Sequence, residues 1–245
     1  MTASHGEPRH RVVQWATGNI GSRTLRAAIR HPRLEVVGVY AHSAAKEGKD
    51  AGALCGLPPL GVRASRDLDA VLALEADCVL YTPRELDPDA VCALLAAGTN
   101  VGATRTDFHH PTAMDPALRR RVEAACDRGG ASIHSTGISP GFSTEVLPLA
   151  LASLQRRVDA LTIEEFADLS RRDSPGLLFE VMGFGGPAGA VDERRLSNLR
   201  ASFGPSLRLV ADALGLAVVE VEVHAETART SGRPTIAAGV LRAGT

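Results

Sequence analysis

The first part of the chain alternates short apolar runs with segments of helical spacing. Five runs have the length and composition of buried strands, at residues 11–16, 34–41, 78–81, 100–104 and 131–135. Between the first two runs, Ile20, Leu25 and Ala28 recur at the spacing of one helix face. Right-handed crossovers between such strands give an α/β fold, a doubly wound parallel sheet with helices on both faces.

Two of the predicted helices have clear first residues. Asp87-Pro88 and Asp115-Pro116 each place a capping aspartate before a proline at the first helical position. Gly98 and Gly129 are the residues expected to end these helices. Strands and helices therefore alternate as far as Gly137.

The sequence pattern changes after Gly137, and this divides the chain into predicted domains at 1–137 and 138–245. The last residues, TIAAGVLRAGT, resemble a strand that returns toward a sheet, with no element after it. We therefore expect the second domain to be of α+β type and either unusually small or truncated.

A helix, two strands and a break in a further helical region are predicted in this second domain. Residues 144–154 predict a helix and residues 160–166 a strand. Residues 218–224 alternate valine with charged side chains, as a half-exposed strand does. Gly204-Pro205 is expected to break a helical region.

The stretch VVQWATGNIGSRTL, residues 12–25, carries a variant of a glycine-rich turn. In a Rossmann fold, three glycines allow the bend, the approach of a pyrophosphate and the close packing of helix on strand. Here these positions are Ala16, Gly18 and Gly21. A strand-to-helix turn without a ligand is the alternative to a dinucleotide site. The residues expected to bind the dinucleotide are Thr17, Gly18, Asn19, Ile20 and Gly21.

The residues after the second predicted strand indicate which dinucleotide binds. An NAD site usually has an acidic residue there, which binds the ribose hydroxyls. This chain has His42 and Ser43 instead, followed by Lys46, one of its two lysines. These residues favour NADP(H), because they are suited to a 2′-phosphate. A solvated polar loop is the alternative.

Ligands of an open α/β sheet lie beyond the carboxyl ends of its strands. This rule selects Thr82 and Pro83 after the third predicted strand, and TRTDFHHP, residues 104–111, after the fourth. Hydride transfer that interconverts a carbonyl or imine with an amine needs a group that exchanges a proton, and Asp107 is the candidate acid-base residue. Asp107 as the cap of a turn is the alternative.

Three histidines lie near these strand ends. His110 is a candidate substrate contact, with a packed or solvent-facing role as the alternative for both His109 and His110. Adjacent histidines point apart in an extended chain and no third ligand is evident, so no metal is expected. His134, inside the last predicted strand, is expected to be a core residue.

Charge and composition narrow the class of protein. The formal net charge of −1 predicts no binding to nucleic acid or to a membrane surface. The chain begins without the apolar core of a signal peptide and has no run long enough to span a membrane, so a cytoplasmic location is expected. The cysteines form no CxxC pair and are expected to be reduced thiols.

Five motifs, QWATGNIG, GVYAHS, GKDAGALCG, TRTDFHHP and STGISPGF, resemble the 2,4-diaminopentanoate dehydrogenase and native amine dehydrogenase-like family. Its members are often described as dihydrodipicolinate reductase N-terminal-domain proteins. The resemblance implies a Rossmann domain, an α+β domain that forms a homodimer, and NAD(P)H-dependent interconversion of an amine with a ketone and ammonia. It places Asp107 where the family has a catalytic glutamate, and family members continue beyond residue 245.

The sequence therefore predicts an NADP(H)-preferring oxidoreductase that acts on C–N bonds, with a small carbonyl compound or amine as its substrate. A non-catalytic NADP-binding protein is one alternative. Two others keep hydride transfer but change the substrate, either to a cyclic imine, as in dihydrodipicolinate reductase, or to an alcohol.

Overall fold

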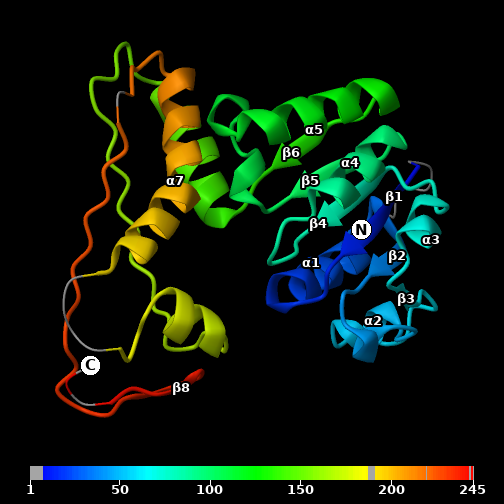
Figure 1. Ribbon diagram of the computed structural model, residues 1–245, viewed down its shortest axis with the longest axis horizontal. Helices are drawn as coiled ribbons and strands as arrows, with labels where there is room; N and C mark the ends of the chain where they lie inside the picture. The colour runs from blue at the N-terminus through cyan, green and yellow to red at the C-terminus, as the bar shows by residue number, and fades with distance from the viewer. Residues whose placement is uncertain (1–7, 187–190, 219, 243, 245) are drawn as a thin grey trace, which may run out of the picture. The chain divides into compact units, whose positions relative to one another are not determined.

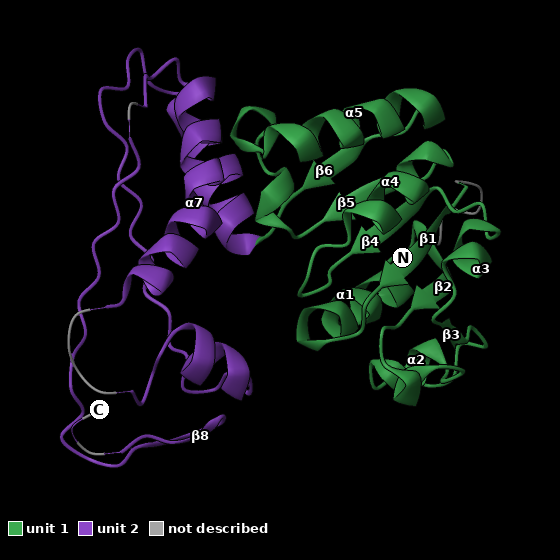
Figure 2. Cartoon of the chain, in the orientation of Figure 1, with its two compact units in different colours: residues 1–137 green, residues 138–245 purple. Residues whose placement is uncertain are grey.

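The computed structural model describes residues 8–186, 191–218, 220–242 and 244. The chain divides into two compact units, Met1–Gly137 and Ile138–Thr245 (Figure 2). No helix among the described residues has the length and the apolar character needed to cross a membrane.

A six-stranded parallel sheet forms the centre of the first unit (Figure 1). Its strand order, β3-β2-β1-β4-β5-β6, is that of a doubly wound dinucleotide-binding fold, so the predicted fold class is confirmed. All five predicted strands are present. The sequence does not predict β3, because this strand has only two residues. The strands are β1 (His10–Trp15), β2 (Leu34–Tyr40), β3 (Ala64–Ser65), β4 (Cys78–Tyr81), β5 (Asn100–Ala103) and β6 (Ile133–Ser135).

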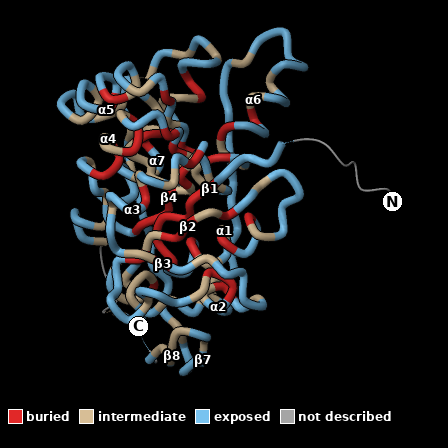
Figure 3. The backbone as a smooth tube through the Cα atoms, turned by 90° about the vertical axis from the view of Figure 1, so that its right-hand side faces the viewer, coloured by how far each residue is buried: buried red, intermediate tan, exposed pale blue. Residues whose placement is uncertain are grey.

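Helices cover both faces of the sheet (Figure 1). Val12 and Val13 of β1 are both buried, and because neighbouring strand residues point to opposite faces, they belong to two separate cores. Figure 3 shows that the buried residues are concentrated along the strands. The Val12 core includes residues of α1 (Asn19–Arg30) and α2 (Ala51–Leu54), and the Val13 core includes residues of α3 (Leu68–Leu72), α4 (Pro88–Ala96) and α5 (Pro116–Gly129).

Gly21, Leu25 and Ala28 show how α1 docks on the sheet. These three residues form the buried stripe of the helix, at the three- and four-residue spacing of one face. The Leu25 side chain is fully buried, which is worth about 1.5–3 kcal/mol relative to exposure. The first turn of α1 is therefore held firmly against β1.

Both predicted aspartate-proline helix starts are confirmed. Asp87 accepts backbone N–H groups at the start of α4, and Asp115 does so at the start of α5. Gly98 follows α4 with a positive φ of 89°, as expected of a residue that ends a helix. Gly129 does not end α5, because it is the last helical residue and Gly130 takes the left-handed position. A β-carbon on Gly129 would lie 1.9 Å from the carbonyl oxygen of Leu95, so this glycine lets α5 approach α4.

The second unit contains helices and one short antiparallel pair of strands. Its predicted helix at 144–154 is present as the end of η4 and as α6. The prediction of strands at 160–166 and 218–224 is wrong, because the described residues of both segments are irregular. Val219 lies outside the described residues. The elements are η4 (Ile138–Val146), α6 (Leu147–Ala152), η5 (Gly176–Val181), α7 (Glu193–Ala213), β7 (Thr235–Ile236) and β8 (Gly239–Val240).

The predicted break at Gly204-Pro205 is also wrong. Pro205 lies inside α7, which continues through it to Ala213. Gly204 and Ser206 are buried on either side of it, and the Ser206 hydroxyl donates to Thr144 Oγ1 of η4 at 3.2 Å. Packing at this point thus offsets the hydrogen bond that proline removes from the helix.

Candidate functional site

The glycine-rich turn leaves the first turn of α1 without a side-chain cap. Gly18 is the residue before α1, and no side chain among the described residues caps the free N–H groups of this helix; the first turn also has no acidic residue. Five other helices, α2, α3, α4, α5 and α7, each begin at an aspartate whose carboxylate accepts a backbone N–H. The positive end of α1 is therefore open to an anion from outside the chain.

The two glycines of the turn have different surroundings. A β-carbon on Gly21 would lie 2.1 Å from the carbonyl oxygen of Ala16 and 2.9 Å from Thr82 Oγ1, so only glycine lets α1 pack this closely on β1 and β4. A β-carbon on Gly18 would meet nothing within 4 Å. Gly21 is thus required by the packing of the protein, whereas Gly18 borders open space.

Ala16, at the first position of the motif, has the backbone of a glycine. Its φ is +71°, in the left-handed region that residues with a side chain rarely adopt. The amide of Gln14 donates to the Ala16 carbonyl oxygen at 2.9 Å and so helps to hold this bend. The tight turn is therefore made despite the alanine.

Thr82, directly after β4, supports the turn with its hydroxyl. The Thr82 hydroxyl donates to the carbonyl oxygen of Trp15 at 3.0 Å and accepts from Gln14 Nε2 at 2.8 Å. Both Thr82 and Pro83 are buried. In this arrangement Thr82 joins β1 to β4 at the point where the strand order reverses, and its hydroxyl is used within the protein.

Lys46 is the predicted residue that the structure brings directly to the turn. Its ammonium group donates to the carbonyl oxygen of Thr17 at 2.6 Å. The Thr17 side-chain oxygen is buried and has no hydrogen-bond partner among the described residues. A cation and an unused hydroxyl thus lie together at the uncapped end of α1.

His42 and Ser43 lie in the exposed loop between β2 and Lys46. The His42 ring stands edge-on to Tyr40, with ring centroids 5.2 Å apart, and Tyr40 stacks on Trp15 at 3.8 Å. This aromatic stack runs from the start of the turn to the loop after β2, so it fixes the position of His42 relative to the turn.

Arg66 is a basic residue of this corner that the sequence analysis missed. It follows β3 directly, and its Nε donates to the carbonyl oxygen of His42 at 3.2 Å. β3 pairs in parallel with the end of β2, which brings Arg66 level with the loop. The only signal in the sequence was β3 itself, a strand too short to be recognised.

Asp107 lies in the short helical turn η2 (Thr106–Phe108), directly after β5. Phe108 is buried and anchors this turn, and the Ser135 hydroxyl donates to the Arg105 carbonyl oxygen at 2.6 Å. Arg105 contacts one carboxylate oxygen of Asp107, with Nε at 2.9 Å and Nη2 at 2.8 Å. The side chain of Asp107 is 32% exposed, so this ion pair faces solvent in part.

Tyr81 is a fully buried phenol, unlike the partly exposed ion pair of Arg105 and Asp107. Tyr81 ends β4 beside Ala103 of β5, and burial raises the pKa of its phenol. Its hydroxyl oxygen accepts the N–H of Asp87 at 3.0 Å. Tyr81 is thus a neutral structural group, and Asp107 is the carboxylate at this end of β5.

The three histidines have three different environments. His109 is buried and His110 is half-buried, with its Nε2 2.7 Å from Thr112 Oγ1. His134 is exposed on β6, so the prediction that it is a core residue is wrong. β6 is the last strand of the sheet, and an edge strand leaves such a side chain uncovered.

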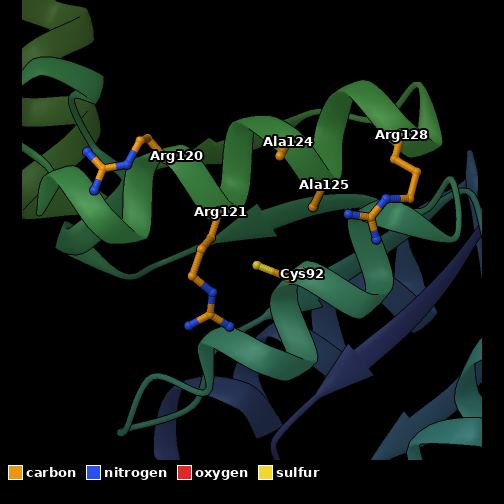
Figure 4. A pocket seen from close by; sticks show the side chains of 6 residues that line it. All are labelled: Cys92, Arg120, Arg121, Ala124, Ala125 and Arg128. Carbon is orange, nitrogen blue, oxygen red and sulfur yellow. The ribbon is translucent and has the colours of Figure 1, made fainter.

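A pocket of about 340 Å³ lies between α4 and α5 (Figure 4), and none of the predicted site residues lines it. Cys92 of α4 and side chains of α5 line it. The thiol of Cys92 is free, and burial raises its pKa. The lining residues from α5 are Arg120, Arg121, Ala124, Ala125 and Arg128.

The sequence of this chain is similar to those of several known proteins. Residues 12–118 match the family described as dihydrodipicolinate reductase, N-terminus. An amine dehydrogenase of Streptomyces virginiae is 33% identical in an alignment 218 residues long that covers 85% of this chain and 60% of that protein. A 4-hydroxy-tetrahydrodipicolinate reductase of Synechocystis is 23% identical in an alignment 222 residues long that covers 79% of this chain and 73% of that protein.

The predicted resemblance is confirmed. The structure of an amine dehydrogenase from Mycobacterium smegmatis has the same fold, with a TM-score of 0.73, 19% sequence identity, and coverage of 98% of this chain and 72% of that one. The chain spans about 60% of the length of its Streptomyces relative.

The residues of the turn fit a dinucleotide phosphate. Three features favour it: the uncapped N-terminus of α1, the open space beside Gly18, and the unused Thr17 hydroxyl near Lys46. Bound phosphate would accept hydrogen bonds from backbone N–H groups of the first helical turn and be drawn to the Lys46 cation.

Proposed function

We propose that this protein is an NADP(H)-preferring oxidoreductase that acts on C–N bonds, similar to amine dehydrogenases. It would convert a small ketone or aldehyde and ammonia to an amine, and the amine back. The sequence similarity to the Streptomyces amine dehydrogenase supports this class of reaction. The observation that carries the proposal is the glycine-rich turn, where α1 has no aspartate cap, in contrast to α4 and α5, the other longer helices described in the first unit.

The preference for NADP(H) rests on the loop after β2. No acidic side chain ends β2, and His42, Ser43 and Lys46 follow it. An acid at this point would bind the ribose hydroxyls of NAD(H) and repel a 2′-phosphate. Charge-assisted hydrogen bonds to phosphate contribute about 1.5–3 kcal/mol each, so this loop favours the phosphorylated cofactor.

The cofactor, when bound, supplies the hydride; the chain supplies orientation and proton transfer. Asp107, at the end of β5, would accept the proton released by an ammonium ion or amine and stabilise the charge of an iminium group. Arg105 contacts only one oxygen of the carboxylate, Oδ2, which leaves Oδ1 for the substrate. His110, three residues away, would contact the substrate.

The first test is a paired titration of the purified chain with NADPH and NADH. Trp15 is the only tryptophan and precedes the turn, so its emission reports binding. We expect saturable binding of both, with NADPH tighter by at least about tenfold. A folded chain that binds neither would refute the proposal.

Substitution of Asp107 tests the reaction. Asp107→Asn keeps the shape of the side chain and removes the base, so turnover should fall by about 10²–10⁴-fold while the NADPH dissociation constant is unchanged. Asp89→Asn is the matched control, because Asp89 also pairs with an arginine, Arg121, but lies on α4. Retained turnover in Asp107→Asn would exclude Asp107 as the acid-base residue.

A second candidate function is that of a non-catalytic NADP-binding protein. The ion pair of Asp107 with Arg105 favours it, because this contact gives the carboxylate a structural partner within the chain. Steady-state assays with ammonium and a panel of carbonyl compounds separate the two functions. Turnover without ammonium would instead indicate reduction of a cyclic imine or of a carbonyl to an alcohol.

A further inference from the structure

Arg66 stands at the corner of the sheet where the ribose end of a dinucleotide would lie. β2 and β3 are parallel and paired, Val39 with Ala64 and Tyr40 with Ser65. The residue after each strand therefore lies at the same edge, and Arg66 comes level with the loop that begins at Ala41. None of the residues assigned above to the cofactor comes from β3.

The guanidinium of Arg66 is held in place through Nε, and its other N–H groups can bind a ligand. Its Nε donates to the carbonyl oxygen of His42 at 3.2 Å, which holds the group against the loop. Its side chain is 46% exposed, and Nη1 lies 3.8 Å from Glu47 Oε2, a long and partly solvated ion pair. The remaining N–H groups can donate hydrogen bonds to a second anion without breaking the bond to His42.

Lys46 provides a cation on the other side of the same loop. Its Nζ is 2.6 Å from the Thr17 carbonyl oxygen, so it faces the turn, whereas Arg66 contacts the loop at His42. Two cations with different partners thus flank the short segment that contains Ser43. This division of contacts suggests that Lys46 and Arg66 bind different phosphate groups.

We infer that Arg66 is a further residue that distinguishes NADPH from NADH, by binding the 2′-phosphate with its guanidinium beside the loop after β2, while Lys46 serves the diphosphate at the turn. An arginine presents several N–H groups in one plane, which suits a phosphate better than a single ammonium does. Glu47 is the counter-ion of Arg66 in the absence of cofactor, and it competes with the 2′-phosphate. The inference rests on the proposed function, because it requires a dinucleotide at the turn.

The test compares NADPH and NADH affinity in Arg66→Gln, by Trp15 emission. We expect the NADPH dissociation constant to rise by about tenfold to hundredfold and that of NADH to change by less than about threefold. Lys46→Gln should weaken both cofactors to a similar extent. Glu47→Gln should tighten NADPH alone, because it removes the competing carboxylate.

Arg63→Gln is the matched control. Arg63 directly precedes β3, is exposed, and donates to the Gly48 carbonyl oxygen at 3.0 Å instead of that of His42. It should change neither affinity by more than about threefold. A second probe is competition by adenosine 2′,5′-bisphosphate and adenosine 5′-monophosphate, which differ only in the 2′-phosphate. Arg66→Gln should weaken the first and spare the second.

The outcomes separate this inference from the proposed function. If wild-type protein binds both cofactors and Arg66→Gln weakens both equally, Arg66 only supports the His42 loop and the inference is overturned. If Arg66→Gln changes neither, it is overturned as well, and the proposed function stands. If the folded wild-type protein binds no nucleotide, both fail.

Discussion

Ala16 shows how much free energy a single methyl group costs at a position with left-handed backbone. A residue with a β-carbon at φ +71° is less stable than glycine there by about 1–2 kcal/mol. Ala16 is also 7% exposed, and burial of its methyl group returns about 0.8 kcal/mol. These opposing terms are of similar size, which explains why alanine is tolerated at this position.

We therefore expect Ala16→Gly to change the free energy of unfolding by less than about 1 kcal/mol. Ala16→Val should lower it by about 2–4 kcal/mol, because a branched side chain is more strained at positive φ and overpacks a buried site. Urea denaturation of the three proteins measures both effects. A valine variant as stable as the wild type would contradict the left-handed assignment.

Gly18 and Gly21 allow binding and packing to be separated. Gly18→Ala meets no atom within 4 Å, so it should fold normally, with a loss of at most about 1 kcal/mol, yet weaken NADPH binding by about tenfold or more. Gly21→Ala would place a methyl group 2.1 Å from the Ala16 carbonyl oxygen and should lower stability by several kcal/mol. Thermal unfolding and NADPH titration of each variant give the two readouts. Equal effects of both substitutions on stability would show that the two glycines do not differ as described.

At the scale of elements, Asp50 joins α2 to the loop before β3. Its carboxylate accepts N–H groups from Leu60 at 2.9 Å, Gly61 at 2.7 Å and Gly52 at 2.8 Å. These bonds, led by that of Leu60, lower the pKa of Asp50 below its ordinary value of 3.8. A lowered folded-state pKa stabilises the protein above pH 3.8, and this contribution is lost as the pH falls through the folded-state value.

Asp50→Asn should therefore lower the unfolding temperature at pH 7 and have a smaller effect as the pH falls below 3.8. The amide also presents an N–H group toward backbone donors, which weakens the cap of α2. Asp69→Asn, an exposed change in the first turn of α3, serves as the control. An effect of Asp50→Asn that is constant from pH 7 to pH 3 would rule out the carboxylate as its cause.

The elements that could be predicted from sequence are those that depend on local pattern. β4 is a run of apolar residues long enough to be recognised, whereas β3 has two residues and exists through its pairing with β2. The segment 218–224 alternates like a strand but has no partner strand among the described residues, and pairing is a property of distant segments.

In the candidate site, too, local features could be predicted from the sequence, and features that depend on distant segments could not. The turn from Ala16 to Gly21 was predictable because its spacing is local. Thr82 was predicted from its place after a strand, but the bonds of its hydroxyl to Trp15 and Gln14, which lie on a different strand, could not be predicted. Arg66 was missed for the same reason, since its place depends on a strand that only the structure reveals.

At the scale of the whole molecule, α7 carries a partly exposed apolar stripe. Leu199, Phe203 and Leu207 recur every four residues, and they are 38%, 37% and 49% exposed. Residues at this spacing share one face of a helix, and an apolar stripe that stays partly exposed is a candidate interaction surface. Because the family resemblance implies a homodimer formed through the second domain, we propose that two copies of α7 meet along this stripe.

Leu207→Asp tests this proposal. A leucine buried at an interface contributes about 1.5–3 kcal/mol, and a buried aspartate adds a desolvation cost, so the dimer dissociation constant should rise at least about tenfold. Ala201→Asp makes the same charge change on the opposite, exposed face of α7 and should leave the dimer intact. Sedimentation velocity over a range of concentrations measures both. A wild-type protein that is monomeric throughout, or a Leu207→Asp variant that dimerises like Ala201→Asp, would show that this stripe does not join two copies.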